Sequence, residues 1–226
     1  MKSFILGVSL AAAMGTVVMA QDENQPLPPR FDRENEVELF NGKDFTGLTF
    51  CLKNHADPSR TWSVTNSVIH CTGTPGGYLR TTQSYSNYFL TVIWRFTKVA
   101  PGADSAGILV QMQPPDKVWP QCIQVQGKHG HLGDLILMEG AECQGHPNMG
   151  TNATVSHQGL DHESPVGDWN TSETICVNRS VTSFINGYLV NEISDTSVTS
   201  GFIGAQSDGG DIEIRRMYFT PLKYSR

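Results

Sequence analysis

The sequence predicts an all-β protein, a jelly-roll β-sandwich of two antiparallel sheets preceded by a signal peptide. Three observations carry this prediction. Apolar and polar residues alternate with a period of two in many short segments, and turns rich in glycine and proline separate those segments. No stretch after residue 20 has the period of an amphipathic helix. Many short strands at this spacing are typical of a two-sheet sandwich.

The first twenty residues have the order of a secretory signal. Lys2 gives a positive start, an apolar stretch follows over 4–18, and a small-x-small pattern favours cleavage after Ala20. The alternative is a membrane anchor, but polar residues interrupt the stretch, which is short for a span of about 20 apolar residues. We therefore expect a secreted or periplasmic protein with no membrane span after signal cleavage.

The rest of the chain divides into a linker and one domain. Residues 21–35 are rich in Gln, Pro and charge and are predicted to be flexible, and 36–226 has the length of a single β-sandwich. The full chain has a net charge of -6 and no cluster of Lys and Arg. Because nucleic acid needs a basic face, this argues against nucleic acid as a partner and leaves neutral carbohydrate open.

All five cysteines follow the predicted cleavage site, and none forms a CxxC pair that would support structural zinc. An oxidising compartment permits disulfides, but the odd count leaves at least one thiol unpaired. Cysteine is also common as a small buried residue. One disulfide and none are both compatible with the sequence.

The clearest strand is predicted over 88–97, where the even positions are apolar and the odd positions include Thr91 and Arg95. Asn186-Gly187 lies between two apolar runs and predicts a tight hairpin. The other predicted strands are 61–64, 68–71, 107–112, 122–126, 134–138, 173–177, 181–185, 188–193, 202–205 and 212–219.

A series of short motifs runs through 37–222. They occupy 39–44, 62–64, 77–80, 88–96, 105–108, 122–126, 167–170, 186–187, 201–206 and 214–215. In this order they resemble the 3-keto-disaccharide hydrolase domain family. The resemblance implies a concanavalin A-like jelly roll, export, and hydrolysis of glycosides oxidised at the C3 hydroxyl.

One departure from that family concerns Gln124-Val125-Gln126, where the family usually has Glu-Val-Gln. If the glutamate does chemistry in relatives, this chain lacks an ionisable group at that position. It would then rely on another base, or be a lectin-like module that binds carbohydrate without cleaving it.

Ordinary glycosidases need two carboxylates that flank the scissile bond. The nearest pattern is Asp211, Glu213 and Arg215, which alternation places on one strand face. The alternative is an exposed strand face with a charge pair. Simple glucanase chemistry therefore has little support.

A ketone at C3 changes what the reaction needs. It acidifies the neighbouring C2–H, so a base can remove that proton, the C1 substituent can leave, and water can add to the enone. This route needs a base and a group that holds the enolate oxygen, rather than a pair of carboxylates.

The candidate catalytic groups are His129, His131 and Glu173. Imidazole acts both as a base and as a metal ligand, so His129, His131 and Asp134 are also a candidate site for a divalent metal ion. A solvated loop is the alternative for this Gly-rich segment. His146, His157, His162 and Glu163 could complete a site only through the fold.

Gln124 and Gln126 share one strand face and can each donate to and accept from sugar hydroxyls. Trp169 is either a platform for a sugar ring or a core anchor. The predicted substrate-binding residues are Arg80, Arg95, Gln124, Gln126, Trp169, Asn170, Gln206 and Arg215.

Overall fold

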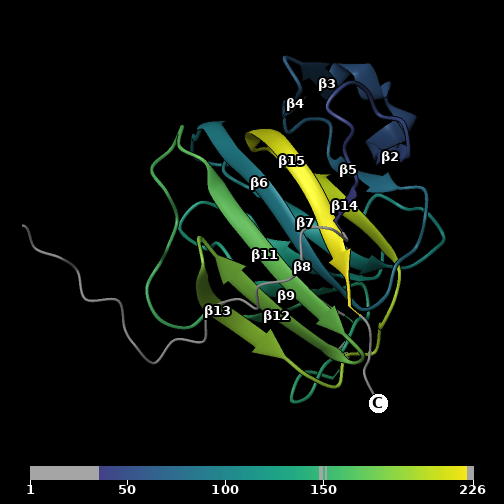
Figure 1. Ribbon diagram of the computed structural model, residues 1–226, viewed down its shortest axis with the longest axis vertical. Coiled ribbons are helices and arrows are strands. Elements are labelled where there is room, and N and C mark those ends of the chain that lie inside the picture. Colours follow the sequence, from purple (N-terminus) through teal and green to yellow (C-terminus); the bar gives the residue numbers. More distant parts are fainter. Residues whose placement is uncertain (1–35, 148–149, 151, 223–226) are drawn as a thin grey trace, which may run out of the picture.

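The computed structural model describes residues 36–147, 150 and 152–222. The predicted signal peptide, 1–20, and linker, 21–35, lie outside the described residues. Two antiparallel sheets face each other, and the helical segments described are short 3-10 turns (Figure 1). The predicted all-β sandwich is confirmed. Among the described segments, no helix has the length and apolar character needed to cross a bilayer.

Sheet A has the strand order β13-β12-β11-β6-β15-β4-β3, and β1 pairs with β15 at one side. Its strands are β1 (Val37–Glu38), β3 (Trp62–Thr65), β4 (Val68–Cys71), β6 (Tyr88–Lys98), β11 (Asn170–Val177), β12 (Ser180–Ile185), β13 (Tyr188–Ile193) and β15 (Asp211–Pro221).

Sheet B has the order β10-β9-β8-β7-β14-β5-β2. Its strands are β2 (Leu48–Leu52), β5 (Gly77–Thr81), β7 (Ala106–Met112), β8 (Cys122–Gln126), β9 (Leu135–Met138), β10 (Ala153–Val155) and β14 (Phe202–Ser207). Two 3-10 turns, η2 (Lys53–His55) and η3 (Pro58–Arg60), follow β2.

Every predicted strand is present, with its ends displaced by at most a few residues. The sequence did not predict β1, β2, β5 and β10. Strand β5 has buried side chains on both faces, including Tyr78 and Leu79, so it lacks the alternation that marks a half-exposed strand. Strands β1 and β10 are too short to show a period.

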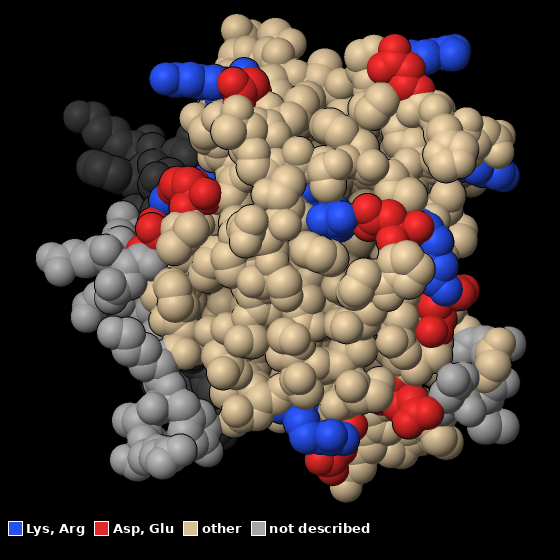
Figure 2. Space-filling model, turned by 90° about the vertical axis from the view of Figure 1, so that its right-hand side faces the viewer, with Lys and Arg blue, Asp and Glu red and all other residues tan. Residues whose placement is uncertain are grey.

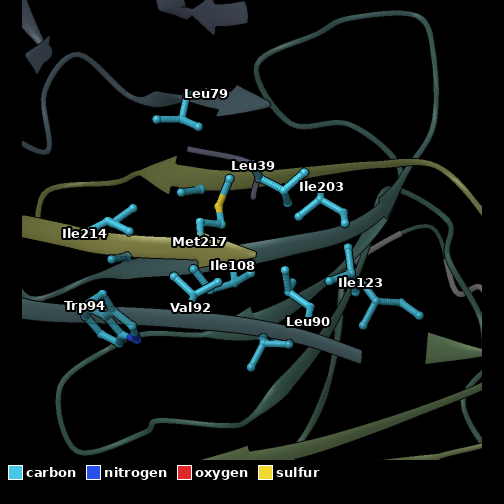
Figure 3. Close-up of a cluster of buried hydrophobic side chains, with 14 of the residues drawn as sticks. Leu39, Leu79, Leu90, Val92, Trp94, Ile108, Ile123, Ile203, Ile214 and Met217 are labelled. Atoms are coloured by element: carbon cyan, nitrogen blue, oxygen red, sulfur yellow. The ribbon is translucent and has the colours of Figure 1, made fainter. Parts of the chain in front are cut away.

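The core fills the space between the two sheets. Leu90 and Val92 of β6 and Met217 of β15 point from sheet A towards Ile108 and Ile123 of sheet B (Figure 3). These side chains are at most 4 % exposed. Alternation along β6 thus places one face in the core, as its sequence predicts.

All five cysteines are free thiols, and all but Cys51 are buried. Burial raises the pKa of Cys71 to about 11 and that of Cys176 to about 12. These side chains therefore act as small apolar residues of the core. The sequence left one disulfide or none as alternatives, and none of the five cysteines forms a disulfide.

Several loops of sheet B lie at one end of the sheet. Because neighbouring strands are antiparallel, β5, β7 and β9 begin where β2, β8, β10 and β14 end. We call this end the sheet B rim. It carries the segments 53–60, 72–76, 103–105, 127–134 and 208–210 and the residues that follow β10.

Candidate active site on the outer face of sheet B

The outer face of sheet B, which points away from the core, is itself largely shielded from water. A second apolar cluster lies on it, formed by Tyr78, Leu109, Met112, Cys122, Ile136 and Met138, with Trp119 and Phe202 packed against it. Polar groups beside such a surface lie in a medium of low dielectric constant, where their hydrogen bonds are stronger than in water.

Three glutamines meet on this face, and we call Gln124, Gln126 and Gln206 the glutamine cluster. Nε2 of Gln124 donates to Oε1 of Gln206 at 2.9 Å and to Oε1 of Gln126 at 2.8 Å. Gln124 and Gln206 are only 4 % and 3 % exposed. The side chain of Gln124 crosses β7 above Gly107, which has no Cβ in its path.

The cluster keeps unused hydrogen-bonding atoms. In residues 36–147 and 152–222, no protein group bonds Oε1 of Gln124 or Nε2 of Gln126 and Gln206. Amide N–H groups and carbonyl oxygens of this kind bind sugar hydroxyls and ketone oxygens. The structure therefore brings together three of the predicted substrate-binding residues.

Gly107→Ala is expected to weaken carbohydrate binding about tenfold by displacing Gln124. A Cβ at position 107 would lie 2.6 Å from Nε2 of Gln124, which is too close for both to stay in place. Calorimetric titration with a 3-keto-disaccharide, the ligand that the family resemblance implies, measures the loss. If displacement is the cause, Gly107→Ala adds little to Gln124→Ala in a double-mutant cycle, and additive losses would contradict this explanation.

Asp208 is the first residue after β14 at the rim. It follows Gln206 by two positions, which is the spacing that places side chains on one face of a strand. Ser105 Oγ donates to Asp208 Oδ2 at 3.3 Å. The side chain is accessible to solvent, yet partial burial raises the pKa of Asp208, and the bond from Ser105 only partly opposes this. A carboxylate with a raised pKa is a stronger base.

A buried aspartate and a histidine lie beside β8, on the side opposite to β7. Gln126 N donates to Asp134 O at 2.8 Å, which places Asp134 beside β8. Asp134 Oδ1 accepts from His157 N and lies 2.7 Å from His157 Nδ1. A carboxylate in this position fixes the orientation of the ring and leaves Nε2 for proton transfer. His131 Nδ1 lies 3.6 Å from Asp134 Oδ2 and is more exposed.

The predicted metal ligands do not converge. His129 Nδ1 contacts Glu163 Oε2 at 2.9 Å, which raises the pKa of His129, whereas His131 turns to Asp134. Across the described ranges, no group of three or more His, Cys, Asp and Glu side chains is placed to hold a metal ion. The side chain of His129 is bound to the loop, close to Phe96, rather than to the cluster.

Arg80 is on the same outer face but is already neutralised. Its Nε and Nη2 donate to the two carboxylate oxygens of Asp116 at 2.8 and 2.7 Å, and its guanidinium lies 3.9 Å from the ring centroid of Phe202. Arg80 lowers the pKa of Asp116, and Tyr78 also donates to it. These contacts hold the segment between β7 and β8 over the face.

Other predicted site residues lie on the far side of the sandwich. Strand register puts Glu173 of β11 and Arg95 of β6 on the outer face of sheet A, away from the glutamine cluster. Trp169 lies between the guanidiniums of Arg95 and Arg215, 4.4 and 4.6 Å from its ring centroid. Grouping these residues with Gln124 in one site was wrong, because period-two alternation gives the face of a strand but not which sheet it joins.

Asn170 and the acidic strand β15 have structural roles. Asn170 is buried and accepts from Ser164 N at 2.8 Å. Glu213 pairs with Arg95 at 2.7 Å, and Asp211 pairs with Lys98 at 2.9 Å. Of the two alternatives for this strand, the exposed face with charge pairs is the one observed.

Charge is dispersed on the face shown in Figure 2. Lys and Arg side chains are scattered there, mostly beside Asp or Glu, over a surface that is otherwise uncharged. No basic patch gathers on that face.

Comparison with known proteins places the fold and the family. Residues 35–220 match the 3-keto-alpha-glucoside-1,2-lyase-like domain. Two structures from Parabacteroides distasonis ATCC 8503, provisionally named glycosyl hydrolases, are 22 % and 17 % identical with TM-scores of 0.63 and 0.62. The first covers 84 % of this chain and 95 % of its own, and the second 83 % and 99 %.

More distant structures share the same fold. The carbohydrate-binding module CBM66 from Bacillus subtilis is 12 % identical, with a TM-score of 0.57 over 76 % of this chain and 93 % of its own. A Bacillus licheniformis β-glucanase is 12 % identical, with a TM-score of 0.54 over 82 % and 97 %. The comparison with curated proteins found no match.

Proposed function

The chain belongs to the 3-keto-alpha-glucoside-1,2-lyase-like domain family, and on this premise we propose that it is an exported enzyme that cleaves 3-keto-glycosides by elimination followed by hydration. The observation that carries the proposal is the glutamine cluster, which lies on a shielded face. Asp208 follows Gln206 by two residues in the chain, and Asp134, which holds His157, bonds the main chain of Gln126. The export part rests on the signal-like pattern of residues 1–20.

Asp208 takes the C2 proton in the proposed reaction. The electron pair moves onto the C3 oxygen as an enolate, which the free N–H groups of Gln126 and Gln206 bind. The C1–O bond then breaks, and His157, which enters the reaction as an imidazolium, gives the proton on Nε2 to the leaving oxygen while Asp134 holds Nδ1–H. The water that adds later returns a proton to Nε2. Water adds at C1 of the enone and a proton returns to C2, so the net change is hydrolysis.

Strand spacing gives the site a suitable width. β14 and β8 are separated by β7, and neighbouring strands lie about 4.8 Å apart, so Asp208 and Gln126 belong to strands about 10 Å apart. Because the side chain of Gln124 covers Gly107, the pyranose ring lies above the amide of Gln124, between the side chains that extend from the two strands. In this arrangement Gln124 remains neutral and positions the other two glutamines.

A lectin-like module is the second candidate. It is favoured by the amide of Gln124, because an uncharged cluster binds sugar hydroxyls without any chemistry. The two functions differ in turnover. Incubation with a 3-keto-disaccharide, followed by mass spectrometry, yields monosaccharide products for the enzyme, and binding without products for the module.

His157→Gln is expected to lower the kcat for a 3-keto-disaccharide by about 10²–10⁴-fold, because it removes the proton donor to the leaving oxygen. His55→Gln is the matched control, since His55 lies in η2 and is exposed. Steady-state kinetics of both variants, with melting temperatures to verify folding, make the comparison. Equal kcat in the two variants would remove His157 from the mechanism.

A further inference from the structure

A hollow of about 390 Å³ opens at the sheet B rim, beside the candidate active site. The two 3-10 turns η2 and η3 and the segment before β5 surround it. Its lining residues are Lys53, Asn54, Ala56, Arg60, Thr72, Thr74 and Pro75. The lining contains two cations and two hydroxyls but no carboxylate.

The two cations of the hollow are not neutralised. Neither Lys53 nor Arg60 forms an ion pair with any described residue, in contrast to Arg80 and Arg95, which each bind a carboxylate within 2.7 Å. Asp57 is near Arg60 in the chain, and that cation is one of the causes that lower the pKa of Asp57, but the carboxylate bonds Ser59 N at 3.0 Å and forms no ion pair with Arg60. Two positive charges that form no ion pair, in one concavity, attract an anion.

The hollow is connected to the active site by strand order. Leu52 pairs with Gly77, and Gly77 pairs with Ser207, so the ends of β2, β5 and β14 lie side by side. Lys53 follows β2, and Asp208 follows β14. Only β5 lies between these two strands, so they are about 10 Å apart. A disaccharide can span this distance.

Resting on the proposed function, we infer that the hollow binds an oxyanion substituent, a sulfate, phosphate or carboxylate, carried by the glycoside whose oxidised ring lies over the glutamine cluster. Lys53 and Arg60 would hold the anion by charge-assisted hydrogen bonds, and the hydroxyls of Thr72 and Thr74 would add to them. The substrates are then anionic rather than neutral 3-keto-glycosides.

Calorimetric titration of the mature protein with sodium sulfate at low ionic strength tests the hollow by itself. We expect saturable binding that Lys53→Gln and Arg60→Gln each weaken about tenfold. Lys43→Gln is the matched control, because Lys43 is exposed and unpaired among the described residues but does not line the hollow. Sulfate binding that is absent, or equal in all four proteins, would overturn the inference.

A second titration uses the Asp208→Asn protein, in which cleavage is expected to be slow, and compares a 3-keto-disaccharide with its monosulfated derivative. We expect the sulfated sugar to bind about tenfold more tightly to this protein, and the addition of Lys53→Gln to remove the difference. Equal affinities alongside specific sulfate binding would overturn the assignment to the substrate. Both readouts are binding, so an absence of cleavage would reject the proposed function and leave the result for the hollow unaffected.

Discussion

Asp208→Asn is expected to lower the kcat for a 3-keto-disaccharide by about 10²–10⁴-fold, since asparagine cannot take the C2 proton. The activity of the wild type should rise as the pH increases through the pKa of Asp208, which burial raises above 3.8. The acidic limb of the pH profile therefore lies at higher pH than that of an ordinary aspartate. Steady-state rates measured across pH for the wild type and the variant test both expectations.

The stability of Asp208→Asn follows from the same shift. A raised pKa in the folded state means that the contribution of this group is present below its unfolded pKa and is lost as pH rises through its folded pKa. At neutral pH the variant should therefore melt no lower than the wild type. Asp195→Asn, an exposed carboxylate paired only with Arg179, is the control and should retain full activity. Full activity in Asp208→Asn would reject this residue as the base.

Leu90→Ala is expected to lower the free energy of unfolding by about 2–5 kcal/mol. Leu90 of β6 is 0 % exposed and packs between the two sheets (Figure 3), and the sandwich around it is too closely packed to fill the cavity left by the substitution. Urea denaturation of both proteins measures the change.

Leu160→Ala provides the comparison for the core. Leu160 is 77 % exposed, so the same substitution there should change the free energy of unfolding by no more than about 0.5 kcal/mol. Similar losses at positions 90 and 160 would mean that the space between the sheets does not carry the stability of the fold.

The fold could be predicted because alternation is a local property. The long strand β6 has five apolar residues facing one side, and the Asn186-Gly187 turn fixes the hairpin of β12 and β13. Strand β5 could not be predicted in this way, because Tyr78 and Leu79 are buried on opposite faces. The order of strands within each sheet depends on long-range pairing that no local pattern encodes.

The site could be predicted only in part, for the same reason. Gln124, Gln126 and Gln206 do meet, but Arg95 and Trp169 lie on the opposite sheet. Asp208 could not be recognised as a site residue, because the Asp-Gly-Gly segment that it begins is typical of a turn. The available signal was its spacing of two residues from Gln206, which is the period of a β-strand.

The His-Gly-His segment gave a partly useful signal. His131 does lie beside Asp134, but the histidine closer to this carboxylate is His157, which follows Asp134 by 23 residues. Only the pairing of β9 with β10 brings that residue to the rim. A contact of this kind needs the fold.

The central claim is that cleavage proceeds through loss of the C2 proton, and isotope exchange tests it most directly. The mature protein is incubated with a 3-keto-disaccharide in D₂O, and the 3-keto-monosaccharide product is analysed by mass spectrometry and NMR. Authentic product, kept in D₂O for the same time, corrects for spontaneous exchange. The account predicts one deuterium at C2 in nearly every enzymatic product molecule; cleavage with the original hydrogen retained at C2 would contradict it.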